Sequence, residues 1–221
     1  MKIVAISAKI GCGKSTTCKR IAAGYAFPQI ASFARLLKEE CAEALGFPAH
    51  LCYTEDGKNA LVHIPDWFLP YCKEAVQNSS GENSMATVRQ CLQGYGTEYR
   101  RGQNSDYWVS EMNREILEAR KQGKEIFLID DLRFVNEAKY VINQGGYLFR
   151  IEPHPEWIPG PHADHESETA LDEFVGWSAA FRPEYSQGAL AEVALSMLGY
   201  MQIFPRSMVK VALAPQERRP L

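Results

Sequence analysis

The chain has 221 residues and a mass of 24.9 kDa, enough for a domain that buries a hydrophobic core without a metal or a disulfide. Hydrophobic residues make up 46% of it and charged residues 23%, as in ordinary soluble proteins, which excludes global disorder. The formal net charge of −3 and the pI near 6.0 give no general attraction to nucleic acid or to an anionic membrane. A polyanionic ligand would therefore have to be held by a local cluster of basic groups.

The six cysteines and the distribution of apolar residues indicate the compartment. No two cysteines form a CxxC pair, and the first residues lack the apolar run of a secretory signal. No stretch approaches the roughly 20 apolar residues that a membrane span requires. We therefore expect a cytoplasmic protein with reduced cysteines and no membrane partner.

The predicted elements alternate between strands and helices. In chain order they are a strand at 2–7, helices at 14–25 and 32–46, an irregular segment at 47–85, helices at 87–101 and 108–122, a strand at 125–131, a helix at 136–143, a strand at 147–152, an irregular segment at 154–168, a helix at 188–200 and an edge strand at 208–214. This alternation predicts an α/β fold with a parallel central sheet and helices on both faces. Residues 215–221 are expected to form a frayed tail.

Residues 8–15, AKIGCGKS, lie between the first strand and the first helix and fit a Walker A phosphate loop, with alanine in place of its first glycine. Gly11 and Gly13 would let the backbone curl so that N–H groups point at phosphate oxygens, and the helix adds its positive end. Lys14 would reach the β- and γ-phosphates, and Ser15 would bind Mg²⁺. The alternative is a chance glycine-rich turn, which the flanking strand and helix argue against.

The rest of the chain offers groups for a second phosphorylated substrate. No NKxD-type motif of a guanine-reading GTPase occurs. Basic side chains are instead spread through the predicted helices and the irregular region, at Arg35, Lys38, Lys58, Arg89, Arg100, Arg101 and Arg133. The pattern favours a phosphotransferase over a regulatory GTPase.

Five segments occur in an order that resembles one family. They are SFARLLKE (32–39), TVRQCLQGYGTEYRR (87–101), LIDDLRFVNEA (128–138), GGYLFRI (145–151) and HESE (165–168). Together they resemble the phage-type deoxynucleoside monophosphate kinases over about residues 3–195, and the patterns RxxLQxxGTExxR and DxRFxxEA are the most specific part of the likeness. The resemblance implies a three-layer α/β P-loop NTPase fold like that of adenylate kinase, with a parallel central sheet, a monophosphate-binding flap and a short lid.

The resemblance also implies an activity and an organisation. Such an enzyme transfers the γ-phosphate of ATP to a deoxynucleoside monophosphate, giving the diphosphate and ADP, with Mg²⁺. We expect one kinase domain over 1–221, with a flap inserted at about 32–105 and a lid at about 153–170. Its partners would be small nucleotides, with a homodimer left open and with no nucleic acid expected. Its location would be the cytoplasm, that of the host cell if the gene belongs to a phage.

Roles for individual residues follow from the same resemblance. The expected catalytic residues are Lys14, Asp131 and Arg133, and the expected Mg²⁺ ligands are Ser15 and Asp131. The expected donor-binding residues are Lys9, Gly11, Cys12, Gly13, Lys14, Ser15 and Thr16. The expected acceptor-binding residues are Phe33, Lys38, Arg89, Gln93, Thr97, Glu98, Arg133 and Glu137. The expected lid residues are Arg150, His165, Ser167 and Glu168.

Several of these residues have a simpler structural alternative. Arg89 and Glu98 would also suit a surface ion pair, Phe33 core packing, and Gln93 and Thr97 a helix cap or a turn. Of the adjacent carboxylates, Asp131 is preferred because it is in register with the DxR pattern, and Asp130 would then be solvated or start a helix.

Two features of the predicted lid leave other interpretations open. The side chain of Arg150 could face the core instead of a phosphate. The histidines at 154, 162 and 165 raise the question of a metal site, but their spacing fits no zinc pattern. His165 could touch a phosphate, brace the lid or be solvated.

Two rival functions share the phosphate loop. One is a kinase of the same fold that acts on a modified base or nucleotide in DNA, which would need a basic groove. The other is a nucleotide-binding protein without catalytic activity.

Overall fold

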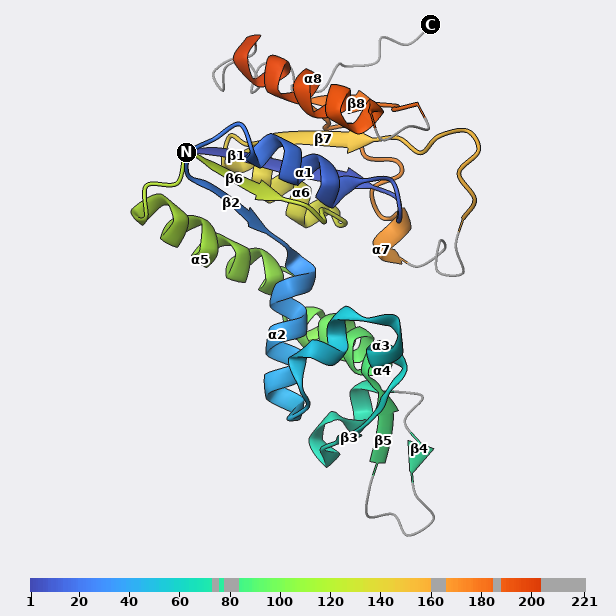
Figure 1. Cartoon of the computed structure of the whole chain (residues 1–221). Helices are drawn as coiled ribbons and strands as arrows, with labels where there is room; N and C mark the ends of the chain where they lie inside the picture. The colour runs from blue at the N-terminus through green and yellow to red at the C-terminus, as the bar shows by residue number, and fades with distance from the viewer. Residues whose placement is uncertain (73–75, 78–83, 160–165, 185–187, 204–221) are drawn as a thin grey trace, which may run out of the picture. The chain divides into compact units, whose positions relative to one another are not determined.

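The computed structural model describes residues 1–72, 76–77, 84–159, 166–184 and 188–203, and its contacts divide the chain into two compact units (Figure 1). The first unit joins residues 1–32 to the segment that starts at 115, and the second consists of residues 33–114. The strand predicted at 208–214 and the tail at 215–221 lie outside the described residues.

The first unit is built on a five-stranded sheet in the order β2-β6-β1-β7-β8, and every neighbouring pair is parallel. The strands are β1 (Lys2–Ala8), β2 (Pro28–Ala31), β6 (Ile126–Ile129), β7 (Tyr147–Ile151) and β8 (Ala179–Phe181). The predicted α/β class with a parallel central sheet is thus confirmed. Sequence analysis missed β2 and β8, because segments of four and three residues are too short for a recognisable hydrophobic period.

Helices cover both faces of this sheet. They are α1 (Lys14–Ala22), α6 (Val135–Asn143) and α8 (Ala189–Ile203), and the single-turn α7 (Glu166–Thr169) lies in the chain between β7 and β8. On one face Cys18 and Ile21 of α1 join Val193 and Met197 of α8 in a buried cluster with side chains of β1, β6 and β7. Helix α6 packs against β1 and β7. The three layers leave the loops that follow the parallel strands at one edge of the sheet, where α/β proteins bind ligands.

The second unit contains helices and a small antiparallel sheet of order β3-β5-β4. Its elements are α2 (Phe33–Leu45), η1 (Ala49–Tyr53), α3 (Glu55–Asn59), β3 (Leu61–Ile64), η2 (Asp66–Tyr71), β4 (Val76–Gln77), β5 (Ser84–Thr87), α4 (Val88–Gln93) and η3 (Gly94–Arg101). Helix α5 (Tyr107–Lys121) crosses the boundary between the units. The prediction of an irregular segment at 47–85 was wrong for its described part, which forms short strands and short helical turns, two of which contain Gly57 and Pro70.

The two glycines expected to interrupt the helix at 87–101 instead allow close packing within it. The segment is helical throughout, and η3 is a π-helix, a wide turn that is often found at functional sites. A Cβ atom on Gly94 would lie 2.1 Å from the carbonyl oxygen of Tyr71, and one on Gly96 would lie 2.9 Å from a methyl group of Leu37. The indole of Trp108 donates to the carbonyl oxygen of Gly96 at 3.2 Å. The GYG sequence thus lets the backbone of Tyr71 and the side chain of Leu37 approach the wide turn.

All six cysteines are free thiols, and only Cys12 is not buried.

Among the described residues, no helix combines the length and the hydropathy that crossing a membrane requires.

Substituting Gly94 tests this close approach. Alanine normally stabilises a helix relative to glycine by up to about 1 kcal/mol, but at Gly94 its Cβ atom would overlap backbone that cannot easily move. We expect Gly94→Ala to lower the free energy of unfolding by about 1–3 kcal/mol, measured by urea denaturation. The matched control is Gly102→Ala, where the nearest atom would be 3.8 Å away and no loss is expected. A Gly94→Ala protein as stable as this control would contradict the packing described.

Candidate active site

The phosphate loop has the backbone that its sequence predicts. Gly11 and Gly13 adopt φ angles of 80° and 84°, in the left-handed region that other residues rarely occupy. Gly13 is the N-cap of α1, and the N–H of Thr17 donates to its carbonyl oxygen at 2.9 Å. The buried β1 therefore leads directly through two left-handed glycines into a helix N-terminus, an arrangement suited to binding anions.

Lys14 curls back over the loop. Its Nζ donates to the carbonyl oxygens of Ala8 at 2.6 Å and Lys9 at 3.0 Å. Burial lowers the pKa of Lys14, and the positive charge of Arg133 lowers it further. Two cationic groups therefore face the same small region, as binding of a highly charged anion requires.

The carboxylate beside Ser15 is Asp130. The Ser15 hydroxyl donates to Oδ2 of Asp130 at 2.7 Å, whereas the nearly buried Asp131 accepts from the Ser32 hydroxyl at 2.9 Å. Because β6 ends at Ile129, the two aspartates leave the strand in succession and face different neighbours. The geometry favours Ser15 with Asp130 as the pair that could hold Mg²⁺, in place of the predicted pair of Ser15 and Asp131.

Arg133 is held at its backbone by Glu137. One oxygen of the Glu137 carboxylate accepts from the backbone N–H groups of Arg133 at 3.0 Å and Phe134 at 3.1 Å. Glu137 is 1% exposed, so its predicted contact with a substrate does not fit this structure. Its carboxylate instead satisfies N–H groups at the start of α6 and fixes the residue that carries the guanidinium.

Glu168 of α7 lies against the phosphate loop. Its carboxylate accepts from the backbone N–H of Ile10 at 3.1 Å and forms an ion pair with Arg133. The Ser167 hydroxyl also accepts from Arg133, at 3.4 Å. Lys9 donates from Nζ to the backbone carbonyl oxygen of Glu168 at 2.6 Å. The predicted lid residues Ser167 and Glu168 thus contact the loop and Arg133, while His165 lies outside the described residues.

Arg150 occupies a buried position beside the end of β1. It is 6% exposed, and it donates to the Ser7 hydroxyl at 2.9 Å and to the Asp172 carboxylate at 3.1 Å. The same carboxylate accepts from Lys9 at 2.7 Å, and the guanidinium lies 5.6 Å from the ring centre of Trp177. Arg150 therefore faces the core, which was the alternative to its predicted role on a phosphate.

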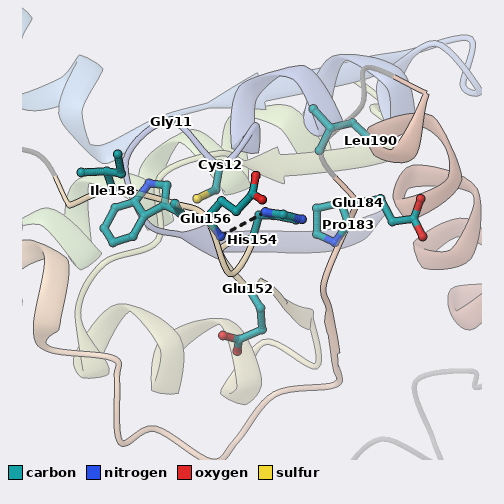
Figure 2. Close-up of a pocket in the computed structure, with 10 residues that line it drawn as sticks. Gly11, Cys12, Glu152, His154, Glu156, Ile158, Pro183, Glu184 and Leu190 are labelled. Atoms are coloured by element: carbon teal, nitrogen blue, oxygen red, sulfur yellow. Dashed lines mark hydrogen bonds between the residues drawn. The ribbon is translucent and has the colours of Figure 1, made fainter.

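A cavity of about 570 Å³ opens beside the loop, within the size range of small-molecule sites. Its lining combines glycine, a thiol, carboxylates and apolar groups: Gly11, Cys12, Glu152, His154, Glu156, Trp157, Ile158, Pro183, Glu184 and Leu190. Figure 2 shows the Cys12 thiol and the His154 ring on this lining, where the backbone N–H of Glu156 donates to His154 at 3.1 Å. The indole of Trp157 donates to the carbonyl oxygen of Ile10 at 3.0 Å.

Among the described residues, Cys12 and His154 belong to no group that could hold a metal. Burial raises the pKa of the Cys12 thiol, so the thiol is protonated near neutral pH. No group of three or more histidine, cysteine, aspartate or glutamate side chains is arranged to hold a metal within the described part of the chain. The histidines at 162 and 165 lie outside that part.

The acceptor-binding residues predicted on α2, α4 and η3 all lie in the second unit. Phe33 is buried and Gln93 and Glu98 are exposed. The Nζ of Lys38 lies 4.6 Å from the ring centre of Tyr53.

Two of the structural alternatives can be compared with the structure. Arg89 donates to Glu55 at 2.6 Å, so its described ion pair joins α4 to α3 and is not the pair with Glu98. The cap of α4 is formed by Thr87 and Gln90, and not by Gln93 or the half-buried Thr97.

Sequence analysis missed three residues of the site. Asp130 was visible as the neighbour of Asp131, and only its orientation could separate the two. Asp172 and Trp157 gave no signal, because about 150 residues of sequence separate each of them from the loop residue that it contacts.

Comparisons with known proteins give no family. No protein-family model matches the chain, and no curated protein matches its sequence. Among solved structures, the chain is similar to shikimate kinase from Bacteroides thetaiotaomicron, with a TM-score of 0.40, 10% identity, and coverage of 91% of this chain and 98% of that one. It is also similar to dephospho-CoA kinase from Campylobacter jejuni, with a TM-score of 0.45, 13% identity, and coverage of 90% and 96%. Neither likeness bears on the substrate of this chain.

Removing the Glu137 carboxylate tests its role at the start of α6. Glu137→Ala would leave two backbone N–H groups without their acceptor, which costs about 1–3 kcal/mol of unfolding free energy. The control is Lys139→Ala on the exposed face of the same helix, where we expect a change below about 0.5 kcal/mol. Urea denaturation of both variants makes the comparison. Equal stability would mean that water replaces the carboxylate and that Arg133 is held by other contacts.

Proposed function

We propose that the chain is an ATP- and Mg²⁺-dependent kinase that phosphorylates a deoxynucleoside monophosphate. The observation that carries the proposal is the phosphate loop itself: two left-handed glycines, Lys14 and a helix N-terminus, with Arg133 close enough to act on Lys14. One cation suits the donor's phosphates and the other suits the acceptor's phosphate. The acceptor class is supported by the sequence patterns at 87–101 and 131–138.

The chemistry needs little beyond alignment and charge neutralisation. The bond between the γ-phosphorus of ATP and its bridging oxygen breaks, a bond forms from that phosphorus to an oxygen of the acceptor monophosphate, and ADP leaves with the electron pair. The acceptor oxygen is already anionic, so no general base is required. Lys14 and the loop N–H groups would bind the donor's phosphates, and Arg133 would grip the acceptor phosphate through two donors.

Ser15 and Asp130 would hold the metal. Their oxygens are hard ligands of the kind that Mg²⁺ prefers, and they are joined by a 2.7 Å hydrogen bond at the start of α1. Bound there with the nucleotide, Mg²⁺ would neutralise charge on the transferring phosphate.

The cavity beside Gly11 and Cys12 is the proposed place of the donor's nucleoside. It begins at the loop that would bind the phosphates, and its volume suits a base with its sugar. The Pro183 and Trp157 side chains offer apolar surface on which a base could lie, and the neighbouring glutamates could accept from its amino groups.

The test is ADP release from ATP and Mg²⁺, with each of the four common deoxynucleoside monophosphates added in turn. We expect one or two of them to raise the rate well above the background without acceptor. If none does, the proposed acceptor is wrong, and either a modified nucleotide, DNA itself or simple nucleotide binding takes its place.

The Lys14→Ala variant tests whether the phosphate loop takes part in the transfer. Loss of a cation that stabilises the transferring phosphate is expected to lower turnover by about 10³-fold or more without unfolding the protein. The control is Lys19→Ala, on the exposed last turn of the same helix, which should keep the wild-type rate and the same melting temperature. A near-wild-type rate in Lys14→Ala would remove the phosphate loop from the reaction.

Asparagine substitutions decide between the two aspartates. We expect Asp130→Asn to reduce the gain in ATP affinity that Mg²⁺ provides by about tenfold, because it removes a charged oxygen next to Ser15. Isothermal titration of ATP with and without Mg²⁺ measures this gain. A larger loss in Asp131→Asn than in Asp130→Asn would reverse the assignment and restore Asp131 as the ligand.

A further inference from the structure

The Glu168 carboxylate occupies a position made for an anion. Its side chain is 4% exposed, and its two oxygens take a backbone N–H from Ile10 and the guanidinium of Arg133. A loop N–H and a guanidinium are the donors that a phosphate oxygen would use. Hydrogen bonds from such donors replace the hydration that the carboxylate loses when it is buried.

A second cation, Lys14, lies within electrostatic reach of the Glu168 carboxylate. The negative charge of Glu168 acts to raise the pKa of Lys14, which burial and Arg133 otherwise lower. The carboxylate thus contacts the phosphate loop at Ile10 and the arginine that follows β6, and its charge also acts on Lys14. The Glu168 carboxylate thus compensates the charge of Lys14 and Arg133, the two cations to which the proposed function assigns phosphate groups.

The segment that carries Glu168 is itself fastened to the loop. Lys9 binds the backbone carbonyl oxygen of Glu168 at 2.6 Å and the carboxylate of Asp172 at 2.7 Å. Asp172 is in turn bound by the buried Arg150. These contacts hold Glu168 close to the loop, where it competes with ligands at a high effective concentration.

We propose that Ile10, Lys14 and Arg133 form a phosphoryl-binding subsite, and that Glu168 fills it until a polyphosphate displaces the carboxylate. The proposal rests on the proposed function in one respect, that the ligand of the loop is a chain of phosphates. Displacement exchanges one anion for another, so neither Arg133 nor the Ile10 N–H is left without a partner. A neutral ligand could not make this exchange, and the subsite thereby selects for negative charge.

Binding of inorganic tripolyphosphate tests the competition directly. The variants are Glu168→Gln and, as a control with the same change in net charge, Glu166→Gln at an exposed position of the same helix. If the carboxylate leaves the subsite in about one-tenth of unliganded molecules, Glu168→Gln binds tripolyphosphate about tenfold more tightly by isothermal titration. Glu166→Gln should bind as the wild type does. Equal or weaker binding by Glu168→Gln would overturn the proposal.

A second measurement uses the unaltered protein and so does not depend on the folding of a variant. Displacement of Glu168 should increase amide hydrogen exchange over residues 166–172 when tripolyphosphate binds. A segment that closes over the ligand would show slower exchange there. Slower or unchanged exchange would therefore reject displacement.

The outcomes separate this inference from the proposed function. If neither the wild type nor Glu168→Gln binds tripolyphosphate, the subsite and the proposed kinase function are both rejected. If both bind it equally and ADP release responds to a monophosphate, the kinase stands and the competition is wrong. Tighter binding by Glu168→Gln in a protein that transfers no phosphate would keep the subsite and reject the kinase.

Discussion

The need to neutralise concentrated positive charge shapes the edge of the parallel sheet. The loop after β1 carries Lys9 and Lys14, Arg133 follows β6 close enough to act on Lys14, and buried cations without partners are costly. Each is therefore matched from within the chain: Lys14 by loop carbonyl oxygens, Arg133 by Glu168, and Lys9 by Asp172. The same carboxylates fasten a segment far along the chain to the loop. The internal ion pairs thus hold the loop, Arg133 and the segment at 166–172 together.

The parts of the fold that sequence analysis predicted are those governed by local pattern. The apolar runs of β1, β6 and β7 and the glycines of the phosphate loop carry their own signal, because burial on both faces and a left-handed backbone restrict the residues allowed. The strands β2 and β8 and the small sheet of the second unit are too short for such a signal, and their stability comes from pairing with distant strands.

The site was predictable to the extent that its chemistry lies in one motif. The spacing in the loop predicted roles for Lys14 and Ser15, whereas the partners of Asp130 and Asp131 depend on which way each side chain leaves β6. The resemblance assigned Glu137 to the acceptor and Arg150 to the lid, whereas in the structure both side chains are buried and bind internal partners. The contacts of Glu168 and Asp172 join residues about 160 apart, and no local pattern contains them.

The uneven burial of the thiols has a practical consequence. Five cysteines are enclosed, and burial raises the pKa of Cys91 to about 12, so they resist alkylation in the folded protein. Cys12 alone is partly accessible, and it lies within the phosphate loop on the wall of the cavity. The native chain therefore carries a single attachment point for a fluorescent or spin label at its proposed nucleotide site, without any cysteine having to be removed first. Alkaline conditions favour its labelling, because its own pKa is also raised.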